Sequence, residues 1–212
     1  MDSVTVCNLA LNMLGINNIV SFDEKNPNAQ ICRQFYPVIR DRVLRDHAWS
    51  FAAKAFELSE VRDIKSIDPQ KPVVSAVPGD CLAMRYILEG LPFRAWGRYI
   101  MTPALPATLV YTARIEDASL FDETFTAALQ YALAVELAMC FSRDASLISM
   151  FRNEYQAQIA LARSIDSAEN YHAYQKEKRS NWIAARYSKS SNIAQMCGQQ
   201  LKFAPGTEGV QA

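Results

Sequence analysis

The residues from Arg40 to Ala52, "RDRVLRDHAWSFA", contain the side chains whose types and spacing come closest to a catalytic set. His47 is one of only two histidines in the chain, with Asp46 before it and Ser50 three positions later. A histidine that is oriented by a carboxylate and bonded to a serine hydroxyl activates that hydroxyl as a nucleophile. The segment therefore raises an enzymatic hypothesis, with Ser50 or a cysteine as the attacking group.

Helical geometry favours a structural role for the same residues. Consecutive residues on a helix point roughly 100° apart, so Asp46 does not face His47. His47 follows Val43 by four positions and lies in the last helical turn, where a histidine can bond the terminal carbonyls and complement the helix dipole. We expect His47, Trp49 and Phe51 to form a structural joint at the exit from the helix into the first strand.

No other pattern predicts catalysis, a cofactor or a metal. The sequence lacks G-x-S-x-G, H-E-x-x-H and a glycine-rich phosphate loop. It has no C-x-x-C pair, and two histidines cannot complete a zinc site. We therefore predict no catalytic residue, no cofactor and no metal site. The scattered free cysteines indicate a reducing compartment, and Cys7, Cys32 and Cys140 lie in helical apolar patterns as small hydrophobic residues.

The composition is that of a globular protein: 50% of the 212 residues are hydrophobic, and 22 Lys and Arg balance 22 Asp and Glu. This balance gives no global field for nucleic acid or a membrane surface. The N-terminus lacks the features of a signal peptide, and we expect no apolar run of the roughly 20 residues that cross a bilayer.

The elements that position these residues follow from periodicity and capping signals. Apolar residues at helical spacing predict helices over about 3–14, with Ser3 as N-cap, and 27–47, with Asn26 as N-cap before Pro27. A second pair of helices spans about 121–168, with Asp144 capping the later one and a turn near Ser142.

Residues from about 50 to 115 have the alternation and the proline and glycine punctuation of four or five antiparallel strands. The order predicts an α+β fold. It consists of a helical body at 1–49 and 116–170, an antiparallel β insert at 50–115, and a C-terminal arm at 171–212. Glu136, in the apolar run "YALAVELAMCF", is either a functional acid or, as we favour, the partner of an arginine on a neighbouring helix or subunit.

The arm is basic and aromatic, with five basic side chains and one acidic side chain over residues 171–189. It is a solvated tail, a nucleic-acid contact or a segment that orders on a partner, and its aromatic content favours the last. The candidate contacts with a partner protein or a neighbouring subunit are Tyr171, Tyr174, Lys178, Arg179, Trp182, Arg186 and Tyr187.

Four blocks in order resemble one known family: "SFDEKNPNAQICRQFYPVIRD", "RDRVLRDHAWSFA", "VPGDCLAM" and "YTARIEDASLFDETFTAALQYALAVELA". They are similar to segments of the head-to-tail adaptor proteins of short-tailed bacteriophages, often labelled tail tubular protein A. The blocks cover about residues 5–170, and the matches to L-R-x-H-x-W-x-F-A and E-D-x-x-L-F-D carry most weight.

The resemblance implies a structural protein of the virion tail or neck, assembled in the host cytoplasm, and no enzyme. Members of this family form a dodecameric ring beneath the portal, extend the DNA channel and present a docking platform for the tail nozzle. The implied partners are copies of the same chain, the portal protein and the nozzle protein. DNA passes through the channel without sequence-specific binding, and the C-terminal segment reaches onto the portal.

Two other functions stay open beside this one and the enzymatic hypothesis. One is a head-completion or tail-tube-terminating protein of a related tail type. The other is a DNA-binding module that acts through the basic arm, for which DNA affinity would fall steeply with salt and would depend on residues 171–212.

Overall fold

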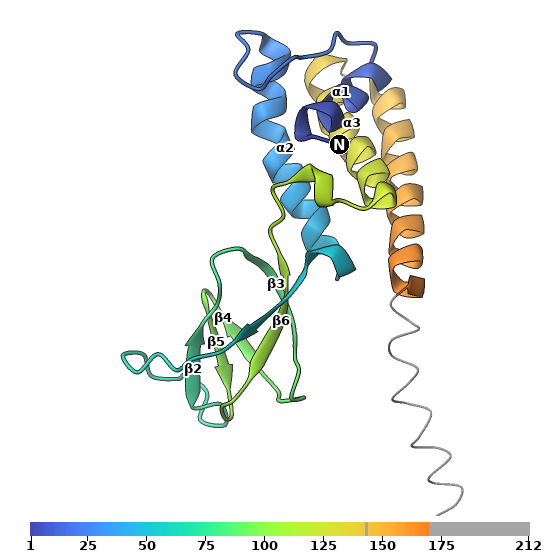
Figure 1. The fold of residues 1–212 in the computed structure, drawn as a ribbon. Coiled ribbons are helices and arrows are strands. Elements are labelled where there is room, and N and C mark those ends of the chain that lie inside the picture. The colour runs from blue at the N-terminus through green and yellow to red at the C-terminus, as the bar shows by residue number, and fades with distance from the viewer. Residues whose placement is uncertain (143, 170–212) are drawn as a thin grey trace, which may run out of the picture. The chain divides into compact units, whose positions relative to one another are not determined.

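The chain folds as an α+β protein in the computed structural model, which describes residues 1–142 and 144–169 (Figure 1). Its helices are α1 (Ser3–Met13), α2 (Pro27–Asp46), α3 (Glu123–Phe141) and a helix over residues 145–169. Residues Met1–Asp166 form one compact unit. A second unit begins at Ser167, and the structure describes only its residues 167–169. The predicted order of helices, strands and helices is confirmed.

Short polar side chains cap the start of each helix. The predicted caps are confirmed with one exception, and Asp122 is a cap that was not predicted. Asn26, Asp122 and Asp144 accept backbone N–H groups of the first turns of α2, α3 and the 145–169 helix, at 3.1, 2.7 and 2.9 Å. The exception is α1, where Asp2 and not Ser3 is the N-cap and accepts from the Thr5 N–H at 2.7 Å. Asp2 is favoured over Ser3 as the N-cap because its carboxylate accepts from the Thr5 hydroxyl as well as from the Thr5 N–H.

Helix α3 is the centre of the core. Its side chains Phe125, Leu129, Leu133 and Leu137 are fully buried, and the helix packs against both α1 and α2. By length and composition α3 could cross a bilayer, so the expectation that no apolar run reaches that length is wrong. More than half of its apolar window is buried inside the protein, which is the pattern of a core helix.

The cysteines only partly follow the prediction. Cys7 of α1 and Cys32 of α2 are buried in the core as small hydrophobic residues. Cys140, by contrast, is exposed near the end of α3. Its position in an apolar run was misleading because that run continues on to the outer face of the helix, where Met139 is exposed as well.

The β region consists of two three-stranded antiparallel sheets. One has the order β1 (Ala53–Glu57), β6 (Thr108–Ala113), β3 (Cys81–Ile87), and the other β2 (Val73–Ala76), β5 (Tyr99–Thr102), β4 (Arg94–Trp96). The six strands exceed the four or five predicted because "FRAWGRYIM" holds two of them. Trp96 pairs with Tyr99 across a two-residue turn at which Gly97 has a φ of 59°, a left-handed conformation that glycine adopts without strain.

Candidate functional site

The candidate catalytic residues His47 and Ser50 lie where α2 leads into β1. His47 is the C-cap of α2 with extended backbone angles, and Ser50 opens a short 3-10 helix, η1 (Ser50–Ala52), that leads into β1. We call residues 46–52 the junction segment. Its backbone leaves one regular element and enters the next within a few residues, so its polar groups need partners from elsewhere in the chain.

The main partner of the junction segment is Asp166 of the 145–169 helix, whose side chain is almost completely buried. One carboxylate oxygen, Oδ2, lies 2.9 Å from His47 Nε2. The other, Oδ1, accepts from the Ser50 N–H at 2.9 Å and from the Ser50 hydroxyl at 2.5 Å. A single carboxylate therefore binds both of the candidate catalytic side chains and the first N–H of η1.

This order of contacts differs from that of a nucleophilic triad. In a triad the histidine lies between the carboxylate and the serine, so that it can take the hydroxyl proton. Here the carboxylate of Asp166 lies between His47 and Ser50, and the hydroxyl donates to the carboxylate. The arrangement satisfies a helix end and a loop, and it gives His47 no path to the Ser50 proton.

Asp46 is directed away from His47, as helical geometry predicts. Its carboxylate forms an ion pair with Arg163. Arg163 and Asp166 are three positions apart and so share one face of the 145–169 helix. Two successive residues at the end of α2 are thus bound by two residues on one helical face.

The carbonyls at the end of α2 are bonded by Arg85 of β3, so the prediction that His47 would bond them is wrong. Arg85 Nη2 donates to the carbonyl oxygens of Arg45 at 3.1 Å and His47 at 2.5 Å, while Nε donates to Thr112 Oγ1 at 2.7 Å. Burial and, to a lesser extent, the neighbouring Arg45 charge lower the pKa of the Arg85 guanidinium. Arg85 Nη2 carries two N–H donors and reaches both carbonyls, whereas His47 Nε2 contacts Asp166.

Replacement of Arg85 by methionine tests this contact. The variant leaves two terminal carbonyls and the Thr112 hydroxyl without their donor, so we expect the free energy of unfolding to fall by about 1–3 kcal/mol. Urea denaturation followed by circular dichroism measures the loss. Arg62→Met is the matched control: Arg62 is exposed, and a change there is expected to stay within about 0.5 kcal/mol. Equal losses in the two variants would contradict the assigned role.

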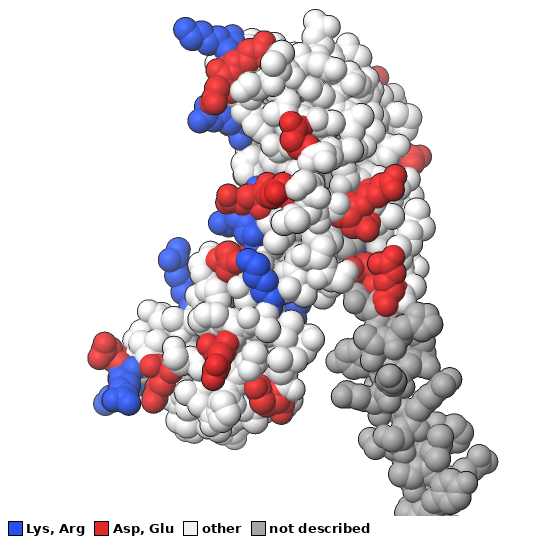
Figure 2. All heavy atoms as spheres, viewed as in Figure 1, with Lys and Arg blue, Asp and Glu red and all other residues white. Residues whose placement is uncertain are grey.

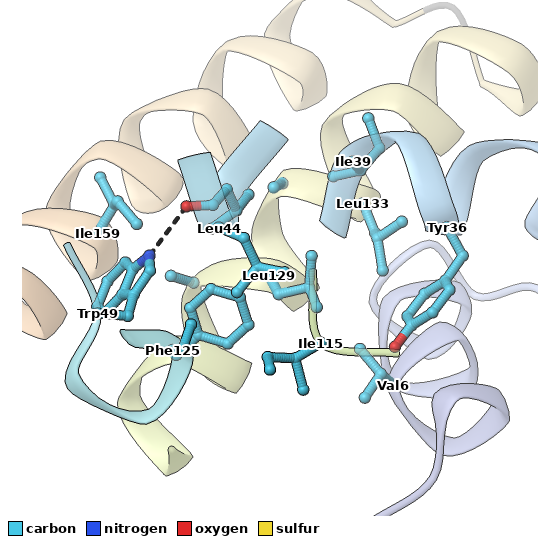
Figure 3. Packing of buried hydrophobic residues seen from close by; sticks show 14 of the residues in the cluster. Val6, Tyr36, Ile39, Leu44, Trp49, Ile115, Phe125, Leu129, Leu133 and Ile159 are labelled. Atoms are coloured by element: carbon cyan, nitrogen blue, oxygen red, sulfur yellow. Dashed lines mark hydrogen bonds between the residues drawn. The ribbon is translucent and has the colours of Figure 1, made fainter. Parts of the chain in front are cut away.

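Aromatic rings from distant parts of the chain pack together beside the junction segment. The Trp49 side chain is 1% exposed, and its Nε1 donates to the Val43 carbonyl at 3.0 Å (Figure 3). Its ring meets those of His47 and Phe125 edge-on, with centroids 4.8 and 5.1 Å apart. Figure 3 shows Trp49 between Ile159 and Phe125, so rings and aliphatic side chains from three elements enclose it.

Phe51 extends the same cluster toward the start of α3. Its ring centroid lies 5.0 Å from that of Phe125 and 5.9 Å from that of Phe121. Edge-to-face and tilted ring pairs at these separations contribute beyond the burial of area alone. The sequence segments around Phe51 and Phe121 are therefore in direct contact, although 70 residues of chain separate them.

Two further carboxylates tie the strands to each other and to α2. Asp41 accepts from Arg114, just after β6, at 2.8 Å. Asp80, before β3, accepts from Lys54 at 2.9 Å and from the Tyr111 hydroxyl at 3.1 Å. The Lys54 hydrogen bond holds the pKa of Asp80 below its ordinary value of 3.8.

Asp80 gives a prediction for acid stability. Because its pKa is lower in the folded state than in the unfolded state, its contribution is complete above about pH 4 and is lost as the pH falls through the folded pKa. We expect Asp80→Asn to flatten the decrease in unfolding free energy below pH 4. The change at pH 7 should stay below about 1 kcal/mol, since the pair is partly exposed. Urea melts at pH 7, 4 and 3 give the comparison, and parallel curves for the two proteins would refute the assignment.

Glu136 of α3 pairs with Arg42 of α2, with Oε1 and Nη1 2.9 Å apart. The favoured partner, an arginine of a neighbouring helix, is confirmed. Asp117 caps the 3-10 helix η2 (Ala118–Leu120), and Asp122 caps α3, so both acidic residues act at helix starts. Over residues 1–142 and 144–169, no group of three His, Cys, Asp or Glu side chains is arranged to hold a metal ion.

No protein-family model matches this chain, and a search of curated proteins finds no relative. The sequence-predicted partner contacts are outside the described residues, so the structure gives no geometry for Tyr171, Tyr174, Lys178, Arg179, Trp182, Arg186 or Tyr187. His47, Trp49 and Phe51, by contrast, lie together at the junction segment. The roles of Asp166, Arg163 and Arg85 were not predicted, because the only sequence signal for each was a charged residue within an apolar pattern.

Proposed function

We propose that this chain is a structural virion protein: a head-to-tail adaptor of a short-tailed bacteriophage. In this function twelve copies of the chain form a ring beneath the portal. The ring extends the DNA channel and provides the docking platform for the tail nozzle. The proposed location is the tail or neck of the virion, after assembly in the host cytoplasm, and the protein performs no catalysis.

The contact between the two most specific blocks supports this proposal best. The L-R-x-H-x-W-x-F-A block supplies Trp49 and Phe51, and the block that contains E-D-x-x-L-F-D supplies Phe121 and Phe125. These four rings pack in one cluster. The two blocks therefore depend on each other in this chain, because the rings of each are buried against the rings of the other.

The polar residues of the blocks have structural uses as well. Asp41 and Arg114, from the first and fourth blocks, form an ion pair. Asp80 of "VPGDCLAM" joins β3 to β1 and β6 through Lys54 and Tyr111. His47 and Ser50, the strongest catalytic candidates, share the Asp166 carboxylate. This use of the motif residues favours a structural protein over an enzyme.

Electron microscopy with the cognate portal protein tests the proposal. We expect negative-stain images of the mixture to show a ring of added density at the portal base, with twelve-fold symmetry. Portal alone is the reference. The full chain with Trp182 and Tyr187 replaced by alanine should attach less, since the arm is assigned to the portal contact. Images without added density at the portal base would overturn the proposal.

Cross-linking inside purified virions distinguishes the adaptor from its nearest alternative. An adaptor beneath the portal cross-links to both portal and nozzle proteins. A tail-tube-terminating protein of a related tail type cross-links to tube subunits instead. Recovery of tube cross-links without portal cross-links would replace the adaptor with that alternative.

A further inference from the structure

A pocket of about 530 Å³ lies among the end of α2, strand β3 and the β4–β5 turn. Its apolar lining includes Val77, Leu82, Met84 and Phe93. Two arginines, Arg45 and Arg98, also line it. The volume is within the range of about 300–1,000 Å³ that holds small molecules in proteins, and the mixture of apolar walls with a few charged groups is typical of such sites.

The charge at this pocket is unbalanced in a protein that is neutral overall. No carboxylate is among the residues that line it. Among the described residues outside the pocket, Arg42, Arg114 and Arg163 pair with carboxylates, whereas the exposed Arg62 does not. Figure 2 likewise shows Lys and Arg over α2 and the strands lying mostly beside Asp or Glu. Within residues 1–142 and 144–169, neither Arg45 nor Arg98 forms an ion pair.

The fold holds further positive charge beside the pocket. Arg85 is fixed on the carbonyls of Arg45 and His47, which keeps its guanidinium near that of Arg45. The Arg45 charge contributes to lowering the pKa of Arg85, as expected for like charges held close together. An anion in the pocket would relieve this repulsion, because guanidinium groups bind carboxylate and phosphate oxygens through paired N–H donors.

We propose that this pocket binds an organic anion: a carboxylate or phosphate group carried on an apolar body. Arg45 and Arg98 bind the anionic group from two elements, and Phe93 with the aliphatic side chains contacts the apolar body. The pocket does not overlap the aromatic cluster, since no residue of that cluster lines it. Carboxylate and phosphate share the recognition chemistry, and the probes below distinguish them.

Titration calorimetry of the full chain with three probes tests the proposal: phenyl phosphate, phenylacetate and benzyl alcohol. We expect at least one of the two anions to bind and the neutral alcohol to bind at least tenfold more weakly. Affinity should fall as salt is raised, because the interaction is between charges. The tighter of the two anions identifies the natural class. Equal binding of benzyl alcohol, or no heat from either anion at millimolar concentration, overturns the proposal.

Variants locate the binding at the pocket. Arg98→Gln and Arg45→Gln should each weaken anion binding about tenfold or more, consistent with the loss of one charge-assisted contact. Both side chains are exposed, and the Arg98 carbonyl that accepts from the Val77 N–H is unchanged, so folding is expected to persist. Arg62→Gln, an exposed arginine away from the pocket, is the control. Unaltered affinity in both pocket variants would place the binding elsewhere and refute the site.

Discussion

Replacing Trp49 by alanine is expected to lower the free energy of unfolding by about 3–5 kcal/mol, the range for a buried aromatic side chain. The side chain is 1% exposed and lies among Phe125, Ile159 and the ring of His47 (Figure 3). Its removal leaves a cavity that helices on either side cannot close, and it also removes the donor to the Val43 carbonyl. Chemical denaturation monitored by far-ultraviolet circular dichroism gives the difference.

Two further variants test how much of this loss comes from packing of the ring and how much from its buried position. Trp49→Phe keeps an aromatic ring but removes the indole N–H, and we expect it to cost less than half as much as alanine. Trp96→Ala is the matched control, because Trp96 is 38% exposed on β4 and its removal should cost about 1 kcal/mol or less. A Trp49→Ala protein no less stable than Trp96→Ala would contradict the central position of Trp49.

Replacing Asp166 by alanine is expected to cost about 3 kcal/mol. The change removes the acceptor of the Ser50 N–H and hydroxyl and the partner of His47 Nε2. Breaking a buried polar pair from one side leaves the other groups desolvated without a partner, which costs more than the pair itself contributes. Thermal and urea denaturation of the full chain measure the effect.

Asp166→Asn tests which part of this contact matters. Asparagine can still accept from Ser50 through its oxygen but carries no charge for His47, so we expect an intermediate loss. Glu154→Ala on the same helix is the control: Glu154 is exposed, and its replacement should change stability by less than about 0.5 kcal/mol. If Asp166→Ala behaved like Glu154→Ala, the carboxylate would have no part in holding the junction segment.

Trp49 and Asp166 stabilise the junction segment from two sides. Trp49 fills the space between α3 and the 145–169 helix, and Asp166 binds the backbone that follows α2. Packing and polar contacts at the junction segment are therefore coupled, and the double variant is expected to lose less than the sum of the two single losses. Under the proposed adaptor function, such a fixed junction would keep the β region in one orientation within each subunit.

The sequence by itself determined the local structure of this protein. The caps at Asn26 and Asp144 and the apolar periodicity of the helices were predicted correctly. These signals operate within a few residues, where chain geometry fixes which groups can meet. For the same reason, the sequence showed that Asp46 and His47 do not pair, since neighbours on a helix diverge whatever the surrounding fold.

Only the tertiary structure decided what binds the junction segment. Asp166 is 119 residues from His47, and Arg85 is 38 residues from it. Neither pairing produces a periodic pattern in a single sequence. A carboxylate or an arginine has many potential partners along the chain, and the packing of the helices and sheets decides which of them is close enough to bind. The division of the strands into two sheets and the pocket between α2, β3 and the β4–β5 turn depend on long-range packing in the same way. Contacts within a turn are set by backbone geometry, whereas contacts between elements are set by the shared core that buries them.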